Sequence, residues 1–177
     1  MIKELNYDLT KKDLMNFAKD CVHAKQYKKQ RWIYSCMFGI IYFIILLILF
    51  NLDGFKSTNL IVTVVGTFVI VIIMYFLYPL KLKQSVKNFS KGIDLNGNTI
   101  IINSDSNTFK GSSKRGTSEW NWSEFKYIYN FKYNILLFFQ EYQAMIIPKR
   151  IFESEQEMNE TWELIQECYN KNREDIR

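Results

Sequence analysis

Histidine and cysteine, two residue types common in catalytic and metal sites, are scarce in this chain. The 177 residues contain one histidine, His23, and three cysteines, Cys21, Cys36 and Cys168. A histidine-based acid–base or metal site would depend on His23 alone, and no Cys-x-x-Cys pair indicates a zinc site or a disulfide framework. The chain also lacks Gly-x-Ser-x-Gly, Walker A and Gly-x-Gly-x-x-Gly motifs. We therefore predict no catalytic, cofactor-binding or metal-binding site and expect no enzymatic activity.

Positive charge is the remaining chemical signal. The formal net charge is +5 and the pI is near 9.0, and lysine and arginine side chains bind phosphate groups. Most of the excess flanks two apolar segments, so attraction to an anionic membrane leaflet explains it, and we expect no nucleic-acid partner. The candidate contacts to a lipid headgroup or a protein partner are Lys83, Lys87, Lys114, Arg115, Lys149 and Arg150.

The pair Lys149 and Arg150 follows Pro148, which ends a predicted strand. Three interpretations of the pair are open. The two side chains form a solvated connection, they contact a phosphate or headgroup, or they pair with Glu153 or Glu155. The first is the simplest, because most charged side chains lie at the solvated surface.

Two segments without a charged residue, Trp32–Leu52 and Ser57–Leu80, dominate the first half of the chain. A helix of either length reaches about 30 Å, the thickness of the hydrocarbon core of a bilayer. We predict that they form a transmembrane helical hairpin in the cell membrane. Because neither segment contains an ionisable charge, an ion or proton path through this chain is not expected.

Lysines and an arginine flank the cytoplasmic ends of the predicted hairpin. They precede the first segment and follow the second, whereas the loop Asp53–Asn59 has one acid and one lysine. The positive-inside rule therefore predicts that both termini are cytoplasmic and that this loop is external. An aromatic belt at the same end is predicted from Trp32, Tyr34, Tyr75 and Tyr78.

Small residues lie at helical spacing within both predicted spans, where they let helices approach closely. Packing inside the hairpin is the simpler interpretation, and contacts in an oligomer are the alternative. The residues concerned are Ser35, Gly39, Thr63, Gly66 and Thr67.

The residues before the hairpin predict a strand and a helix. Ile2–Leu9 alternates, and Thr10 is a suitable N-cap for a helix that has Asp13 in its first turn. This helix runs toward the basic cluster, and we expect it to continue into the first span. Its strand shares the predicted side of the membrane with the C-terminal part and is expected to join the same sheet.

The C-terminal part alternates like a small antiparallel sheet. Asn96-Gly97 signals a turn, and Ser104–Gly116 is expected to be a loop or a poorly ordered hairpin. The aromatic side chains along Lys126–Tyr133 are most simply sheet core, with a partner-binding groove as the alternative. The predicted strands are Thr99–Ile102, Ser118–Asn121, Lys126–Tyr133, Ile135–Phe139 and Ala144–Pro148.

A capping box at Ser154 and Glu157 begins an amphipathic C-terminal helix. The order of elements predicts an α+β fold in which this helix covers a small sheet. We predict three parts: a cytoplasmic strand and helix over 1–31, the hairpin over 32–81 with its external loop over 53–59, and a cytoplasmic domain over 82–177.

Several of these segments resemble the YcxB-like family. The most specific is Ile-Ile-Pro-Lys-Arg-Ile-Phe at Ile146–Phe152, preceded by Trp122–Ile128 and followed by the capped helix. The start Tyr7–Thr10 and the two central spans are similar as well. The resemblance implies a bacterial membrane protein whose soluble domain is PH-like, a bent sheet capped by a C-terminal helix.

Topology and charge together predict a non-enzymatic module anchored in the inner membrane. Its PH-like domain would be presented to lipid headgroups of the anionic inner leaflet or to a protein partner. The alternative is an immunity protein that protects the producing bacterium against a membrane- or cell-wall-targeting toxin, because small two-span proteins with basic cytoplasmic flanks suit that role.

Overall fold

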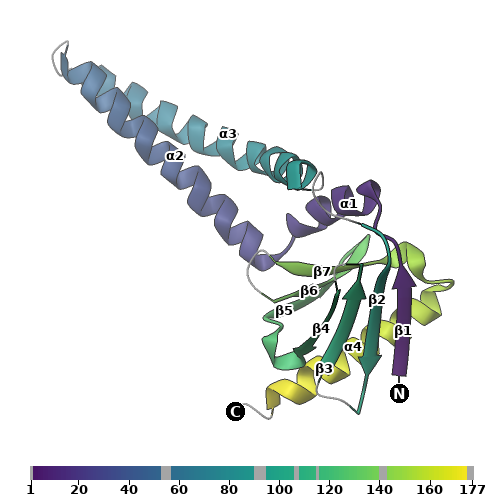
Figure 1. Cartoon of the computed structure of the whole chain (residues 1–177). Coiled ribbons are helices and arrows are strands. Elements are labelled where there is room, and N and C mark those ends of the chain that lie inside the picture. The colour runs from purple at the N-terminus through teal and green to yellow at the C-terminus, as the bar shows by residue number, and fades with distance from the viewer. Residues whose placement is uncertain are drawn as a thin grey trace. The chain divides into compact units, whose positions relative to one another are not determined.

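The computed structural model describes residues 2–52, 57–89, 95–105, 108–114, 116–139 and 143–174. These residues form two compact units (Figure 1). One unit combines Met1–Asp20 with Val86–Arg177, and the other is Cys21–Ser85. The first is a mixed α+β unit and the second is a pair of long helices.

Two antiparallel sheets build the first unit. The larger sheet has the order β1-β2-β3-β4 and the smaller has the order β5-β6-β7. The helices of this unit are α1 (Lys11–Cys21), whose last residue belongs to the second unit, and α4 (Glu155–Glu174). The strands are β1 (Ile2–Tyr7), β2 (Asn98–Asn103), β3 (Thr108–Ser113), β4 (Gly116–Asn121), β5 (Tyr127–Asn130), β6 (Asn134–Phe138) and β7 (Ala144–Pro148).

Strands β1 and β2 pair along their full length although the whole hairpin separates them in sequence. The register runs from Ile2 opposite Asn103 to Tyr7 opposite Asn98. The expectation that the N-terminal strand joins the same sheet as the C-terminal strands is therefore confirmed. The hairpin is an insertion between two neighbouring strands of one sheet.

The core of this unit lies between the two sheets and α4. Its largest fully buried side chains include Phe109, Trp122 and Phe125. Phe109 packs edge-on against the other two rings, with centroids 5.3 Å from Trp122 and 5.5 Å from Phe125. From α4, Leu164, Ile165, Cys168 and Tyr169 complete this core.

The cap of α4 forms largely as predicted. The Glu157 amide donates to Ser154 Oγ at 3.1 Å. The Glu157 carboxylate, however, accepts from the amide of Glu153 at 2.9 Å rather than from that of Ser154. It also pairs with Lys3 of β1 at 2.6 Å, so one side chain caps α4 and ties it to the sheet edge.

Two expectations for the sheet differ from the structure. Ser104–Gly116 was expected to be a loop or a poorly ordered hairpin, but it contains the regular strand β3, whose polar residues pair on both sides with β2 and β4. The aromatic side chains of β5 do not form the core. Ile128, opposite Leu137, packs against the core, while Tyr127 on the other face is 36% exposed. Ile128 faces inward because the inner face of β6 and β7 is apolar.

The second unit consists of α2 (Lys25–Leu52) and α3 (Ser57–Phe89). The expectation that the N-terminal helix continues into the first span was wrong, because α1 ends at Cys21 in a short turn closed by a bond from the Ala24 amide to the Cys21 carbonyl. Of the predicted external loop, positions 57–59 are helical, and positions 53–56 lie outside the described residues.

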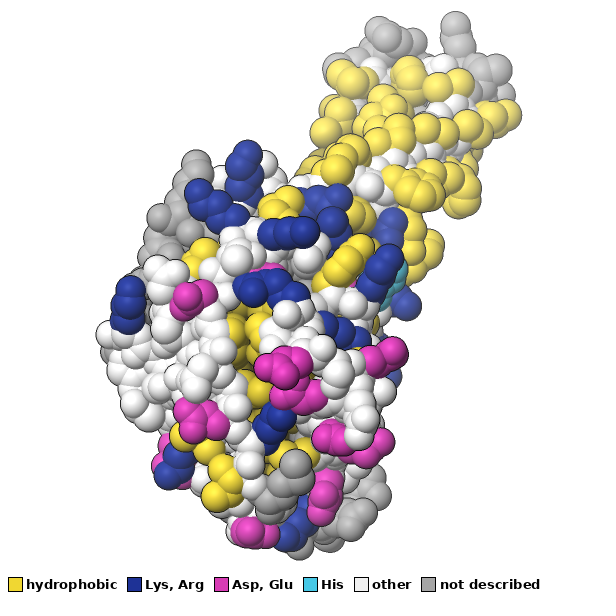
Figure 2. Space-filling model, turned by 90° about the vertical axis from the view of Figure 1, so that its right-hand side faces the viewer, with side chains coloured by type: hydrophobic (Ala, Val, Ile, Leu, Met, Phe, Trp, Pro, Cys, Tyr) yellow, Lys and Arg dark blue, Asp and Glu magenta, His cyan; other side chains and the backbone are white. Residues whose placement is uncertain are grey.

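Both helices are long and apolar enough to cross a membrane, over Lys25–Phe50 and Asn59–Asn88. Figure 2 shows hydrophobic side chains over the visible face of this unit. Among the described residues, every large hydrophobic side chain that is strongly exposed belongs to these two helices, apart from Ile2 and Tyr127.

The small residues of the two helices lie between them. A methyl group added at Gly39 would overlap the Val71 side chain, and one at Gly66 would meet the Tyr42 ring. Ser35 and Thr63 are fully buried, and each donates its hydroxyl proton to a backbone carbonyl of its own helix at 2.8 Å.

Candidate functional site

The predicted contact pair follows strand β7. Pro148 ends this strand, which lies at the edge of its sheet. Proline has no amide proton, and an edge strand tolerates this because its outer side has no neighbouring strand to bond. A short 3-10 helix, η3 (Lys149–Ile151), follows. The Lys149 amide donates to the Tyr133 carbonyl at 2.9 Å, which fixes the turn against the start of β6.

Arg150 binds the first turn of α1. Its Nη2 lies 2.6 Å from Asp13 Oδ2 and its Nε lies 3.0 Å from Asp13 Oδ1. Nη2 also donates to the Asp8 carbonyl at 2.6 Å. The partner of Arg150 is therefore Asp13, and not Glu153 or Glu155, the acidic partners considered from the sequence.

The same carboxylate caps α1. Asp13 Oδ2 accepts from the Thr10 amide and from the Thr10 hydroxyl, each at 2.7 Å. Burial alone would raise the pKa of Asp13, but the hydrogen bonds from Arg150 and Thr10 and the positive charge of Arg150 outweigh burial and hold this pKa below its ordinary value. Asp13 is thus an ionised anchor between β7 and α1.

Lys149 lies near a second carboxylate. Asp20, at the other end of α1, accepts from Asn134 Nδ2 at 2.7 Å, and both residues are buried. Burial raises the pKa of Asp20, although hydrogen bonds from Asn134 and Tyr133 and the charge of Lys149 oppose the shift. Burial also lowers the pKa of Lys149, against the charges of Asp20 and Glu155. The corner that follows β7 therefore holds both ends of α1.

The other predicted contacts lie elsewhere. Lys83 and Lys87 are one turn apart near the end of α3. Lys114 is exposed in the turn between β3 and β4, where its aliphatic part lies beside Gly97. Arg115 lies outside the described residues. The structure thus brings Lys149 and Arg150 together with two carboxylates, and it places Lys83 in a different unit.

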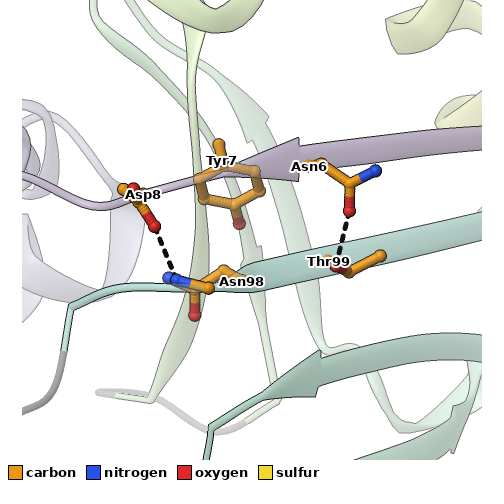
Figure 3. Close-up of a pocket in the computed structure, with 6 residues that line it drawn as sticks. Asn6, Tyr7, Asp8, Asn98 and Thr99 are labelled. Carbon is orange, nitrogen blue, oxygen red and sulfur yellow. Dashed lines mark hydrogen bonds between the residues drawn. The ribbon is translucent and has the colours of Figure 1, made fainter.

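A shallow depression that sequence reasoning missed lies where the chain leaves β1 and enters β2 (Figure 3). Asp8 Oδ1 accepts from the Gly97 amide, and Thr99 donates to the Asn6 side chain, each at 2.5 Å. Tyr7 donates to the Ile146 carbonyl at 2.8 Å, and burial raises the pKa of its hydroxyl. The polar groups of this depression therefore mainly join β1 and its continuation to β2 and the residues before it.

Cations and aromatic rings also meet at the basic end of the hairpin. Arg31 of α2 lies over the Tyr75 ring of α3, 3.5 Å from its centroid. With the two helices exchanging roles, Lys81 of α3 lies over the Tyr34 ring of α2, 3.9 Å from its centroid. The sequence placed Tyr34 and Tyr75 at this end of the hairpin, but it did not predict that each ring pairs with a cation from the opposite helix.

Among the described residues, no group of three or more His, Cys, Asp and Glu side chains is arranged to hold a metal ion. The three cysteines are not bonded to one another; Cys21 and Cys168 are buried, and Cys36 is exposed on α2.

Comparison with known proteins identifies one family. No curated protein and no solved structure matches the chain at a significant level. The family model described as YcxB-like protein matches residues 105–161, a segment that includes strands β3 to β7, the Lys149–Arg150 corner and the start of α4. The family model thus confirms the predicted YcxB-like resemblance over residues 105–161.

Proposed function

We propose that this protein is a non-enzymatic binding module anchored in the cell membrane by α2 and α3. The observation that carries the proposal is the exposure of the apolar side chains on these helices. The described residues of the chain offer them no cover, and contiguous apolar surface of this size is strongly unfavourable in water. A bilayer supplies the missing apolar surroundings.

Charge supports one orientation. Lysines and an arginine cluster at the ends of α2 and α3 that connect to the first unit, and neither helix contains Asp or Glu. The positive-inside rule then assigns this end, and with it both termini and the sheet unit, to the cytoplasm.

The topology of the first unit supports a PH-like interpretation. A four-stranded antiparallel meander is followed by a three-stranded one, and a single helix closes the chain. This arrangement agrees with the bent sheet and C-terminal helix that the family resemblance implies. The unit would bind lipid headgroups or a protein partner at the membrane surface.

The guanidinium of Arg150 is engaged within the sheet unit. Two of its nitrogens already bind Asp13 and Asp8. Arg150 is therefore less available for a headgroup contact than the sequence alone suggests.

The test is purification of the full-length protein from its native membranes in mild detergent, followed by mass spectrometry of proteins and lipids together. Anionic lipid that co-purifies with the wild type, and less with K83Q/K87Q than with the matched double variant K11Q/K12Q, is the expected result. A stoichiometric protein partner without lipid would move the binding role to protein recognition, and a toxin as that partner would favour the immunity alternative. Recovery of the wild type in the soluble fraction would contradict membrane anchoring.

A further inference from the structure

Pro79 leaves a backbone carbonyl of α3 without its usual partner. In an α-helix the carbonyl of Tyr75 accepts from the amide four residues later, and that residue is Pro79, which has no N–H. Arg31 of α2 replaces the missing donor, because its Nε donates to the Tyr75 carbonyl at 2.6 Å. The guanidinium therefore satisfies a group that is costly to leave unpaired inside a membrane.

The same interaction immobilises Arg31. Its guanidinium lies over the Tyr75 ring at 3.5 Å, and Trp32 packs against that ring with centroids 5.0 Å apart. A cation above an aromatic face is attracted by the ring quadrupole. Arg31 thus loses its freedom to move before any ligand arrives, which lowers the entropic cost of binding one.

The two terminal nitrogens of Arg31 have no hydrogen-bond acceptor among the residues that the structure describes. Helices α2 and α3 contain no Asp or Glu, so these two helices offer no carboxylate partner for this charge. The fork of two N–H groups matches the oxygens of a phosphate.

A second cation also lies over an aromatic ring of the opposite helix. Lys81 lies over Tyr34, Tyr34 packs on Tyr78 at 5.8 Å, and Tyr78 donates to Gln30 at 2.6 Å. Tyrosine and tryptophan side chains typically lie at the headgroup level of a membrane. Two fixed cations at this level favour a ligand with a net negative charge.

We propose that Arg31 binds the phosphate of an anionic phospholipid at the basic end of the hairpin, with Lys81 as a second positive charge. The inference rests on the proposed membrane anchoring and names the ligand class of the hairpin itself. Its residues belong to the helical unit, whereas Lys149 and Arg150 belong to the sheet unit.

The test is native mass spectrometry of the full-length protein in mild detergent, titrated with phosphatidylglycerol and, separately, with phosphatidylcholine. R31Q is compared with K29Q, which removes the same charge from an exposed position of the same helix. We expect R31Q to weaken phosphatidylglycerol binding about tenfold and K29Q to change it less than about twofold. Equal effects of the two variants, or equal binding of both lipids by the wild type, would overturn the proposal.

Substitution of Pro79 separates lipid binding from helix packing. P79A restores an amide to pair with the Tyr75 carbonyl, so R31Q/P79A no longer leaves that carbonyl without a donor. The double variant should regain the thermal stability lost in R31Q but not the lipid affinity. Full recovery of lipid affinity would overturn the proposal, because Arg31 would then act only through α3. In parallel, alkaline washing should leave both the wild type and R31Q in the membrane; release of the wild type would overturn the anchoring proposal itself.

Discussion

Arg150 and Asp13 form a bidentate ion pair that joins the turn after β7 to the first turn of α1. The two residues are 137 positions apart in sequence, and the Asp13 side chain is only 4% exposed. Because the whole hairpin is inserted between α1 and the C-terminal strands, this pair holds together two segments that the chain itself joins only through the hairpin. Arg150 belongs to Ile146–Phe152, the most specific motif of the YcxB-like resemblance, so this motif stabilises the fold.

Loss of this pair should destabilise the first unit. R150Q leaves the buried Asp13 carboxylate without its main partner, and we expect the free energy of unfolding to fall by about 2 kcal/mol. K11Q, at an exposed position of the same helix, is the matched control and should have little effect. Thermal unfolding of the detergent-solubilised protein measures both.

A double-mutant cycle tests whether the two residues act through each other. D13N combined with R150Q should cost less than the sum of the single variants, with a coupling of about 1–2 kcal/mol because Arg150 is half exposed. Additive losses would show that the ion pair is not what connects these segments.

The raised pKa of Asp20 makes stability depend on pH. A carboxyl that binds its proton more tightly in the folded protein favours folding below its ordinary pKa of about 4, and this stabilisation is lost as the pH rises through the raised pKa. Asp13, whose pKa is lowered, acts in the opposite sense and destabilises the fold only as the pH falls below its ordinary value.

We therefore expect the melting temperature to fall as the pH rises from about 4.5 toward 7, and D20N should flatten that slope. The comparison is a series of melting curves of wild type and D20N across this range. A slope unchanged in D20N would assign the pH dependence to another group.

The close approach of α2 and α3 at Gly39 predicts a specific rescue. G39A places a methyl group against the Val71 side chain and should destabilise the hairpin by about 1–3 kcal/mol. V71A removes the obstructing atom, so G39A/V71A should be more stable than G39A alone. M37A, at an exposed position of α2, is the control. If V71A fails to rescue G39A, the helices do not pack as described here.

The pairing of β1 with β2 predicts which fragment folds. Residues 86–177 alone lack β1, so the edge of β2 and the side chains packed against Leu5 would be exposed. Residues 1–20 joined by a flexible linker to 86–177 restore that strand and the Arg150–Asp13 pair. Circular dichroism should show a cooperative transition for the linked fragment and none for 86–177. Equal behaviour of the two would mean that β1 is dispensable.

The hairpin and most strands could be predicted from local patterns. Uninterrupted apolar length reveals α2 and α3, alternation reveals β6 and β7, and the capping box reveals α4. These signals depend on neighbouring residues along the chain. The structure agrees with them within one residue for β6, β7 and the start of α4, whereas α2 and α3 extend beyond the apolar segments at their basic ends.

Long-range pairing could not be predicted in this way. Nothing in the sequence near Arg150 identifies Asp13 as its partner. The sequence of β3 is polar, and this segment is a strand because it pairs with β2 and β4. The prediction of which face of β5 points to the core was wrong. The strand has only four residues and carries large apolar or aromatic side chains on both faces, so its sequence does not show which face packs against the core. The donation from Arg31 to Tyr75 follows from Pro79, a signal present in the sequence whose meaning depends on knowing which residue of α2 lies opposite.

The membrane topology of the full-length protein in intact cells tests the proposed anchoring and orientation most directly. Single cysteines at position 56, in the predicted external loop, and at positions 11 and 118, on α1 and β4, would be probed with a membrane-impermeant maleimide in a background without the native cysteines. Membrane anchoring with both termini in the cytoplasm predicts labelling of K56C in intact cells and labelling of K11C and S118C only after permeabilisation, with all three proteins retained in alkali-washed membranes. Labelling of K11C or S118C in intact cells, or release of the protein by alkali, would contradict it.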